Sequence, residues 1–420
     1  MRDVKQSVFK LIQCLVIAYA VVSVIYTAKY FYSHATTPSS PMHNKMTRSD
    51  ESTLAQAQVL QQQQQPLDEN DDDNHSAQVT WHGSQTTMQE PLIMSKLFSD
   101  AMQPSHLQPY YYKARHTHDD QHSDDITMAT LVTKDRFPVL SRLASNYRGP
   151  ISAAIHVNDD DDKEQTLKDL AYVYDTNPDM QQYVDIHLVV DTFDRQFNLW
   201  RNVAKLFART RYVMMLDVDF HVCTNLQSLR MDKPRLASYM RNDQTGQQRA
   251  LVVPAFEYVA QADGLDYKTF PTTKEQLLEE VQQGKIDMFH KSWLKGHGAT
   301  DYQRWYASNT SYVVTDAYDF SYEPYIIYNK QGTPWCDERF IGYGANKAAC
   351  LYEIYLAGIE YMVLPDDFLI HQTHKYPENT RRKERQYNRK LYSNFREELC
   401  LRYARLFLAN GDWETPVPRT

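Results

Sequence analysis

Cysteine is scarce in this chain, which contains only five cysteines among its 420 residues. This number is too small for a fold that is held together by many disulfides. Cys14 lies in an apolar segment near the N-terminus, and the others are Cys223, Cys336, Cys350 and Cys400. The set is compatible with one or two disulfides and equally with free buried thiols.

The chain also lacks a long basic run and any internal repeat. Its formal net charge is −8, whereas domains that bind nucleic acid carry clustered Lys and Arg. We therefore expect no nucleic-acid partner. Aromatic residues, in contrast, make up 12% of the chain and include 30 tyrosines. They provide a sizeable core for one large domain or two ordinary ones.

Only one long apolar run is present, at residues 11–28. It is about long enough to span a bilayer. Basic residues precede it, which favours a cytoplasmic N-terminus. We expect a cytoplasmic tail at 1–10, a transmembrane signal anchor at 11–28 and a luminal remainder. A signal peptide cleaved near residues 18–20 is the alternative, but the run stays apolar past that point.

Residues 29–124 have the composition of a largely disordered luminal stem. They contain five consecutive glutamines at 61–65 and show little periodic apolar pattern. Such a segment cannot bury enough surface to offset the entropy lost on ordering. Asn74 and Asn309 each begin an Asn-x-Ser tripeptide. They would accept N-glycans if they reach the lumen.

From residue 125 onward, apolar patterns of strands and helices alternate. This alternation indicates an α/β domain with a mostly parallel central sheet, which we place at 125–415. Strands are expected at 126–132, 151–157, 186–190, 251–254, 361–364 and 368–371. Helices are expected at 139–147, 164–174, 197–207, 274–283, 345–356 and 381–408, and in the third of these Trp200, Val203, Ala204 and Phe207 fall on one face.

The apolar run at 212–216, which follows Arg211, ends abruptly in Asp217 and Asp219. In an extended backbone, residues two apart point to the same side, so both carboxylates could aim at one point beyond the strand. Ligands of α/β sheets bind beyond the carboxyl ends of strands. Two hard oxygen ligands suit Mg²⁺ or Mn²⁺, which often takes further ligands from phosphates. The stretch therefore predicts a site for a metal bound to a nucleotide diphosphate.

Several stretches together resemble the LARGE-type glycosyltransferases, family 49 of that class. This family includes the glucuronyltransferase half of the LARGE enzymes and the β-1,4-glucuronyltransferase. The matching stretches run in family order over about residues 125 to 375. They are 126–130 (Ile-Thr-Met-Ala-Thr), Asp135-Arg136, 149–152 (Gly-Pro-Ile-Ser), 198–204 (Asn-Leu-Trp-Arg-Asn-Val-Ala), 216–220 (Leu-Asp-Val-Asp-Phe), 337–344 (Asp-Glu-Arg-Phe-Ile-Gly-Tyr-Gly) with Asn346-Lys347, and 363–365 (Val-Leu-Pro) leading to Ile370-His371.

The resemblance implies a GT-A fold, which is a Rossmann-like catalytic domain. It also implies a UDP-sugar donor, a divalent metal (Mn²⁺, or Mg²⁺) and inversion at the anomeric carbon. Asp217 and Asp219 match the metal motif of the family, and His371 matches its third protein ligand. His374 is the competing choice for that ligand. An imidazole is a reasonable ligand of Mn²⁺.

Inversion requires a base that takes a proton from the acceptor hydroxyl, and a carboxylate can serve. Asp337 and Glu338 are the candidates, because Gly342 and Gly344 after them suggest a tight turn that borders a site. We favour Asp337 slightly, and an ordinary ion pair with Arg339 is the alternative.

Donor contacts are expected from Arg201 and Asn202, on the helix before the metal stretch. Lys347 or Arg201 would bind the carboxylate of a glucuronic acid donor. Structural ion pairs are the alternative for both. An aromatic wall for a sugar ring is a further hypothesis, with ordinary core packing as the alternative; its candidates are Trp293, Tyr302, Trp305, Tyr306 and Trp335.

The expected protein is therefore a Golgi enzyme, a type II membrane protein with a luminal catalytic domain that acts on a glycan or glycoprotein acceptor. The second transferase domain of the LARGE enzymes is not found, so we expect one transfer at most. Ala345 stands where the family usually has an aromatic residue, which leaves the sugar specificity open. A homodimer formed through the anchor or stem, a catalytically silent glycan-binding relative and a phosphate-ester hydrolase are the other readings. The hydrolase is disfavoured because no second cluster of metal ligands is found.

Overall fold

A computed structural model describes residues 77–81, 84–88, 105–115, 124–193, 195–314, 318–374 and 381–410. The chain divides into two compact units, Met1–Asn74 and His75–Thr420. The predicted tail and anchor, and the first glycosylation tripeptide up to Asn74, lie outside the described residues. Among the described residues, no helix is both long enough and apolar enough to span a membrane.

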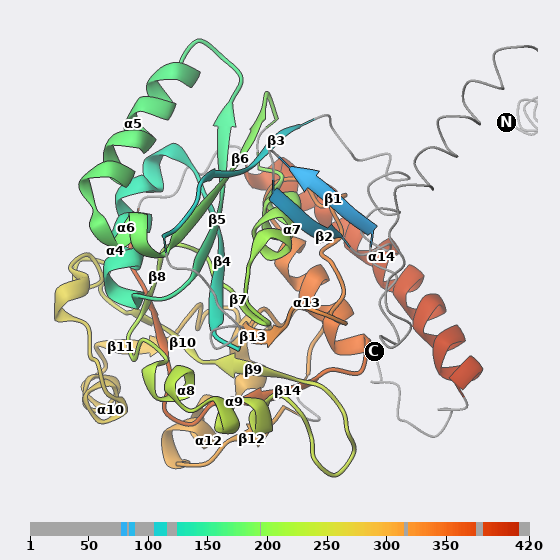
Figure 1. Ribbon diagram of the computed structural model, residues 1–420. Helices are drawn as coiled ribbons and strands as arrows, with labels where there is room; N and C mark the ends of the chain where they lie inside the picture. Colours follow the sequence, from blue (N-terminus) through green and yellow to red (C-terminus); the bar gives the residue numbers. More distant parts are fainter. Residues whose placement is uncertain are drawn as a thin grey trace, which may run out of the picture. The chain divides into compact units, whose positions relative to one another are not determined.

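The larger sheet has nine strands in the described part of the chain (Figure 1). Strands β4, β5, β6, β7, β9 and β14 run in one direction, and β3, β12 and β13 run against them. The expected parallel centre is thus present, in a mixed sheet. In spatial order the strands are β12 (Tyr312–Val313), β14 (Glu360–Val363), β9 (Arg249–Val253), β13 (Tyr325–Asn329), β7 (Tyr212–Met215), β4 (Ile126–Val132), β5 (Ile151–Asn158), β6 (Val184–Asp191) and β3 (His106–Tyr112).

Strand β3 corrects the stem boundary that we expected at residue 124. It pairs antiparallel with β6 at the edge of the sheet. Pro109 lies inside β3, and proline is tolerated in an edge strand because one side of that strand needs no partner. A second part of the expected stem forms the antiparallel pair β1 (Ala77–Trp81) and β2 (Ser84–Met88). The expectation of a largely disordered stem was therefore wrong for these segments.

Two groups of helices cover the two faces of the sheet (Figure 1). Side chains alternate across a strand, so each strand contributes to both layers. On one face, Leu140 and Leu170 pack with Met128 and Val132 of β4. On the other, Trp200 and Val203 pack with alternate residues of the same strands. The helices of the first face are α4 (Phe137–Tyr147), α5 (Lys163–Thr176) and α6 (Pro178–Tyr183); those of the second are α7 (Phe197–Phe207) and α13 (Asn346–Leu356).

A smaller four-stranded sheet, in the order β11-β10-β15-β8, adjoins the carboxyl ends of the parallel strands. Strand β10 pairs parallel with β15, and β15 pairs antiparallel with β8. Its strands are β8 (Phe220–Val222), β10 (Ala255–Tyr258), β11 (Ile286–Met288) and β15 (Leu369–His371). The remaining helices are α8 (Gln227–Met231), α9 (Lys233–Tyr239), α10 (Lys274–Gln282), α11 (Leu294–His297), α12 (Tyr302–Ala307) and α14 (Arg381–Asn410), with 3-10 turns at Lys134–Arg136, Tyr267–Thr269 and Gly298–Thr300.

Helix α7 is buried on both its apolar and its polar face. Trp200, Val203, Ala204 and Phe207 face the sheet with at most 2% exposure. The opposite face carries polar and charged side chains that are buried as well: Asn198, Arg201, Asn202 and Lys205. Buried polar groups need partners, and the helix finds them in the segment that leads to α13.

Candidate active site

Asp217 lies at the end of β7, surrounded by three donors. Its Oδ1 is 3.5 Å from Nη2 of Arg201, and its Oδ2 is 3.1 Å from Nζ of Lys347. The hydroxyl of Tyr325 donates to Oδ2 at 2.8 Å. Burial alone would raise the pKa of the Asp217 carboxyl, but Lys347, Arg201 and Tyr325 outweigh it and hold this pKa well below its usual range. Asp217 is therefore an anion at any physiological pH.

The chain turns between the two predicted metal ligands, which corrects the extended geometry we expected. Strand β7 ends at Met215, and the backbone N–H of Phe220 donates to the Asp217 carbonyl at 3.0 Å. The second sheet begins at Phe220, so the chain has to change direction before it. The rule that residues two apart share a side therefore does not apply here. Both carboxylates remain at the carboxyl edge of the sheet and are partly exposed.

Asp219 also has nitrogen partners, an arginine and a histidine. Its Oδ1 is 2.8 Å from Nε of Arg136, and its Oδ2 is 3.2 Å from Nε2 of His374. Its backbone carbonyl accepts from the N–H of Gln372 at 2.8 Å. The segment after β15 is thereby held against the turn that carries Asp219.

His371 lies beside the same turn. It is opposite Phe220 in the β8–β15 pair, and the two ring centroids are 5.0 Å apart. The ring centroids of His371 and His374 are 5.3 Å apart. Burial lowers the pKa of His371 to about 4, although the nearby Asp219 opposes this. The imidazole is therefore neutral at pH 7, which is the form that binds metals.

The donor types around the turn fit a hard or borderline divalent cation, since they are carboxylates and neutral imidazole. Within the described residues, however, no three His, Cys, Asp or Glu side chains form a group that could hold a metal ion. Arg136, Arg201 and Lys347 occupy carboxylate oxygens instead. A bound metal would exchange with some of these partners. The ligand set Asp217, Asp219 and His371 stays a prediction.

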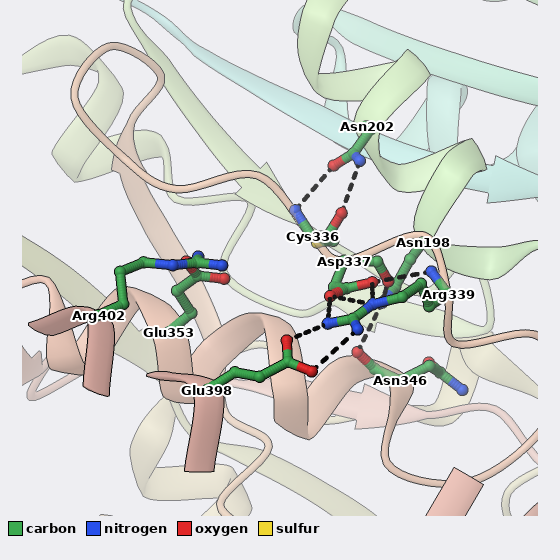
Figure 2. Close-up of polar contacts among 9 residues, drawn as sticks. All are labelled: Asn198, Asn202, Cys336, Asp337, Arg339, Asn346, Glu353, Glu398 and Arg402. Carbon is green, nitrogen blue, oxygen red and sulfur yellow. Dashed lines mark hydrogen bonds and ion pairs between the residues drawn. The ribbon is translucent and has the colours of Figure 1, made fainter. Parts of the chain in front are cut away.

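The segment before α13 is fixed to the polar face of α7 (Figure 2). The side chain of Asn202 donates to the carbonyl of Cys336 at 2.8 Å and accepts from its N–H at 3.0 Å. Asn198 donates to the carbonyl of Asp337 at 2.8 Å and to that of Asn346 at 3.0 Å. Side-chain amides can satisfy backbone groups in this way where no regular structure does. The backbone at Asp337 is therefore held in place from the centre of the domain.

The two candidate bases have different surroundings. Arg339 donates to the Asp337 carboxylate through Nη2 at 2.7 Å and through Nε at 3.0 Å. The same guanidinium bonds Glu398 of α14 at 2.7 Å (Figure 2). Glu338 accepts from Asn202 at 2.8 Å. The ion pair with Arg339 that we considered is thus present, and the choice between Asp337 and Glu338 stays open.

A disulfide joins Cys336 to Cys350 of α13. It closes the segment that contains Asp337 and Glu338 into a loop fixed at both ends. In the part of the chain that the structure describes, Cys223 is a free buried thiol and Cys400 a free exposed one. The sequence was compatible with one disulfide and two free thiols but did not indicate which cysteines pair.

Helix α14 supports the turn that we expected at Gly342 and Gly344. Both glycines have positive φ, at +79° and +96°. A Cβ at Gly342 would lie 2.6 Å from Cδ of Glu384, so glycine is required there for space as well as for conformation. Glu384 also accepts from the N–H of Tyr343 at 2.9 Å. Helix α14, which the sequence predicted as a helix at 381–408, thus holds the loop of the candidate bases.

The predicted donor contacts separate into two groups. Arg201 and Lys347 meet at Asp217 and are almost fully buried. Asn202 is 2% exposed and bonds Cys336 and Glu338. In the structure it therefore holds the loop, and its predicted donor contact is untested.

The aromatic candidates do not form one wall. Trp305 and Tyr302 are 0% and 6% exposed and belong to the core. Tyr306 and Trp335 are partly buried and pack against that core. Only Trp293 of this group is strongly exposed, at 42%. The core interpretation is thus confirmed for Trp305 and Tyr302.

Two residues at the centre of the site were not predicted from sequence. Tyr325 comes from β13, which enters the sheet antiparallel between β7 and β9. Glu323, just before it, is influenced electrostatically by Lys347, Arg201 and Asp217, although burial dominates and raises its pKa. Both lie in a region without clear periodicity, more than 100 residues after Asp217, so no local pattern indicated them.

Comparison with known proteins supplies a family. The profile of the family described as "Glycosyl-transferase for dystroglycan" matches residues 125–197 and 191–404. These ranges contain every predicted site residue.

Individual relatives agree with this family. The chain is similar to xylosyl- and glucuronyltransferase LARGE2 of Rattus norvegicus, with 34% identity over 256 residues, 60% of this chain and 34% of the relative. It is 30% identical to LARGE1 of Homo sapiens over 293 residues, 67% of this chain and 36% of the relative. The glycosyltransferase-like protein LARGE of Caenorhabditis elegans is 30% identical over 271 residues, 61% of this chain and 40% of the relative. The chain therefore spans about a third of the length of these relatives.

A solved structure, mannosyltransferase PcManGT from Pyrobaculum calidifontis in complex with GDP-Man and Mn²⁺, superposes with a TM-score of 0.33. The sequence identity is 12%, and the match covers 69% of this chain and 66% of that chain. A superposition at this score carries no argument about fold or function.

Proposed function

The chain belongs to the family of glycosyl-transferases for dystroglycan, and we propose that it transfers a sugar from a UDP-sugar to a glycan acceptor, with inversion at the anomeric carbon. Membership of the family confirms the resemblance seen in the sequence. The names of the relatives mention xylosyl and glucuronyl transfer, so UDP-glucuronic acid and UDP-xylose are the first donors to test. The family description names dystroglycan, which makes a glycoprotein the first acceptor to consider.

The cluster around Asp217 is the observation that carries this proposal. Two buried cations, Arg201 and Lys347, converge on a carboxylate at the carboxyl edge of a mixed α/β sheet. Buried charges are costly unless they are paired, and this edge is where ligands of such sheets bind. We propose the GT-A arrangement for the domain over about residues 105–410, with the donor diphosphate at this edge.

Asp217, Asp219 and His371 would hold Mn²⁺ or Mg²⁺ in this proposal, with His374 as the alternative to His371. The bound metal would supply positive charge to the diphosphate leaving group. Arg201 and Lys347 would orient the donor, and either would pair with the carboxylate of a glucuronosyl group. Both side chains are already buried beside Asp217, so they would need only to exchange Asp217 for the donor when the metal binds.

A carboxylate of the loop at 336–346 would accept the proton of the acceptor hydroxyl. Asp337 and Glu338 are the two candidates. Asp337 is ion-paired with Arg339 at 2.7 Å. Glu338 accepts a bond from Asn202. The variants Asp337→Asn and Glu338→Gln distinguish the two candidates, because only replacement of the base would reduce the transfer rate by a large factor.

We propose a luminal, secretory location, with the anchor at residues 11–28 and Golgi residence retained as predictions. The disulfide between Cys336 and Cys350 supports an oxidising compartment. Asn309 is exposed in a bend between α12 and β12, where an N-glycan would find space.

The test is UDP release by the full chain with a panel of UDP-sugars, Mn²⁺ and β-xyloside or other glycan acceptors. We expect release with one donor, increased by one acceptor, and abolished by chelation. The control variants are Asp217→Asn, expected inactive, and Asp243→Asn, an exposed aspartate in the loop between α9 and β9, expected to be as active as the unmodified chain. If no donor releases UDP and UDP does not bind in the presence of Mn²⁺, the proposal fails and the silent glycan-binding relative becomes the better account.

A further inference from the structure

Trp293 is exposed to solvent, unlike the other described large aromatic side chains near the site. It is 42% exposed, whereas Trp200 and Trp305 are at most 1% exposed. It lies in the segment that joins β11 to α11. An indole removes a large apolar area from water when it is covered, so leaving it exposed has a cost in free energy. Such a side chain is a candidate for contact with a ligand.

The indole ring of Trp293 lies against its own loop. It packs against Gly296, where an added Cβ would lie 2.6 Å from Cε3 and 2.7 Å from Cζ3 of the ring. The N–H of Trp293 donates to the carbonyl of His290 at 2.8 Å, and the N–H of Gly296 donates to that of Trp293 at 3.0 Å. His290 has a φ of +52°, a sparsely populated conformation for a residue with a side chain. The turn of the backbone therefore places the ring against Gly296.

Both ends of this loop contact the residues around Asp217. At one end, the ring centroid of Phe289 is 5.0 Å from that of His371. At the other end, the ring of His297 stacks on that of Tyr325, whose hydroxyl bonds Asp217. The carbonyl of Gly296 accepts from the N–H of Glu323 at 2.7 Å. The Trp293 loop, residues 289–297, thus forms a border of the proposed active site.

An exposed indole at the border of the site suits one kind of ligand in a glycosyltransferase. A pyranose with equatorial hydroxyls presents axial C–H groups on its faces, and these are attracted to the negative face of an aromatic ring. The donor already has the cations at Asp217 for its charged groups. A ring that stays 42% exposed suits the acceptor, which reaches the site from solvent.

Building on the proposed function, we propose that Trp293 is the stacking platform for the acceptor sugar, a pyranose with equatorial hydroxyls such as a terminal β-xylosyl residue. Gly296 is a positioning residue in this account, because it leaves room for the ring. Leu294 is the neighbour of Trp293 and is 62% exposed, yet it has no flat face to offer a sugar.

Four variants of the full chain test this proposal: Trp293→Ala, Trp293→Phe, Gly296→Ala and the control Leu294→Ala. Methyl β-D-xyloside is the probe, and its binding is followed by saturation-transfer NMR. Transfer is followed by UDP release with and without the xyloside. We expect Trp293→Ala to weaken xyloside binding and to raise its KM by about tenfold. Gly296→Ala should have the same two effects, by a smaller factor, because the added methyl group displaces the ring.

Binding and hydrolysis of the donor should not change in these variants. UDP release without acceptor and the KM for the donor should equal those of the unmodified chain, and so should every value for Leu294→Ala. Trp293→Phe should restore most of the affinity, since a phenyl ring also stacks. Xyloside binding that is equal in Trp293→Ala and the unmodified chain would overturn the proposal, as would a rise in the donor KM. If the binding pattern is as expected but no UDP is released, the proposed function fails while the sugar platform stands.

Discussion

Two of the ion pairs that attach helix α14 to the domain are predicted to have opposite effects on activity and stability. Glu398 pairs with Arg339, which also binds Asp337. Arg402 pairs with Glu353 of α13 at 2.7 Å. Figure 2 shows both pairs, of which only the first reaches the loop of the candidate bases. The variants Glu398→Gln and Arg402→Gln each remove one charge from the same helix.

The surroundings of each pair determine the expected loss of stability. The Arg339 and Glu398 side chains are 35% and 44% exposed, and such pairs contribute about 0–1 kcal/mol. The Glu353 side chain is 9% exposed, so Arg402→Gln leaves a buried carboxylate that accepts from the hydroxyl of Tyr403 at 3.3 Å. An uncompensated buried polar group costs about 1–3 kcal/mol or more. Arg402→Gln is therefore expected to be the more destabilising change.

The pH dependence of the second variant has a definite sign. Burial raises the pKa of Glu353, and Arg402 opposes that rise. Removing Arg402 raises it further. The folded protein then binds this proton more tightly than the unfolded chain, so stability is present at low pH and is lost as the pH rises through the folded pKa. We expect Arg402→Gln to lose more stability at pH 7.5 than at pH 5.

For activity we expect the reverse order, with the larger loss in Glu398→Gln. Freeing Arg339 from Glu398 lets the Asp337 loop shift, and small displacements of catalytic groups cost large factors in rate. We expect Glu398→Gln to lower kcat for transfer by about tenfold, and Arg402→Gln to change it by less than about twofold where it is folded. Urea unfolding and kcat, measured on both variants, test this. If kcat falls in proportion to the loss of stability in both, the loop is not positioned by Glu398.

Three further predictions concern the scaffold. Burial lowers the pKa of His187 to about 3, so the free energy of unfolding should fall as the pH drops below about 6.5, by up to about 1.4 kcal/mol per pH unit. In His187→Asn, the urea midpoint should fall less between pH 7.5 and pH 5 than in the unmodified chain. An equal fall in both proteins would contradict a neutral buried histidine. Gly342→Ala should lower Tm more than Gly284→Ala, because both have positive φ but only Gly342 is crowded by Glu384; equal shifts would show that the contact is unimportant. Reduction of the disulfide, which joins residues 14 apart, should cost roughly 3 kcal/mol and lower kcat, while Cys336→Ser should be insensitive to reductant.

The elements with strong periodicity could be predicted from the sequence. Helix α7 has the predicted bounds, and strands β4, β5 and β6 lie within one to two residues of the expected ranges. The apolar face of α7 was also predicted. Its polar face could not be interpreted, because amphipathic spacing normally places such a face in solvent. Here Asn198 and Asn202 are buried against the backbone of a segment about 135–150 residues later.

Residues that the motifs indicated lie close together in the structure, whereas residues that the topology brings beside them were not indicated by the sequence. Asp217 and Lys347 meet in space although 130 residues separate them, and the resemblance to the family had indicated both. Tyr325 and Glu323 depend on the antiparallel insertion of β13, which no local pattern signals. The edge strand β3 was missed because Pro109 and the polar residues around it read as stem. Long-range pairing, and not local propensity, determined these positions.

The most direct measurement of the central claim is analysis of the acceptor after incubation of the full chain with Mn²⁺, a UDP-sugar and a glycan. The account predicts an acceptor that has gained one sugar in β linkage from an α-linked donor. It also predicts that Asp217→Asn forms no such product while remaining folded. UDP release without any modified acceptor, or equal product from Asp217→Asn, would contradict the assignment of the transferase site to the cluster around Asp217.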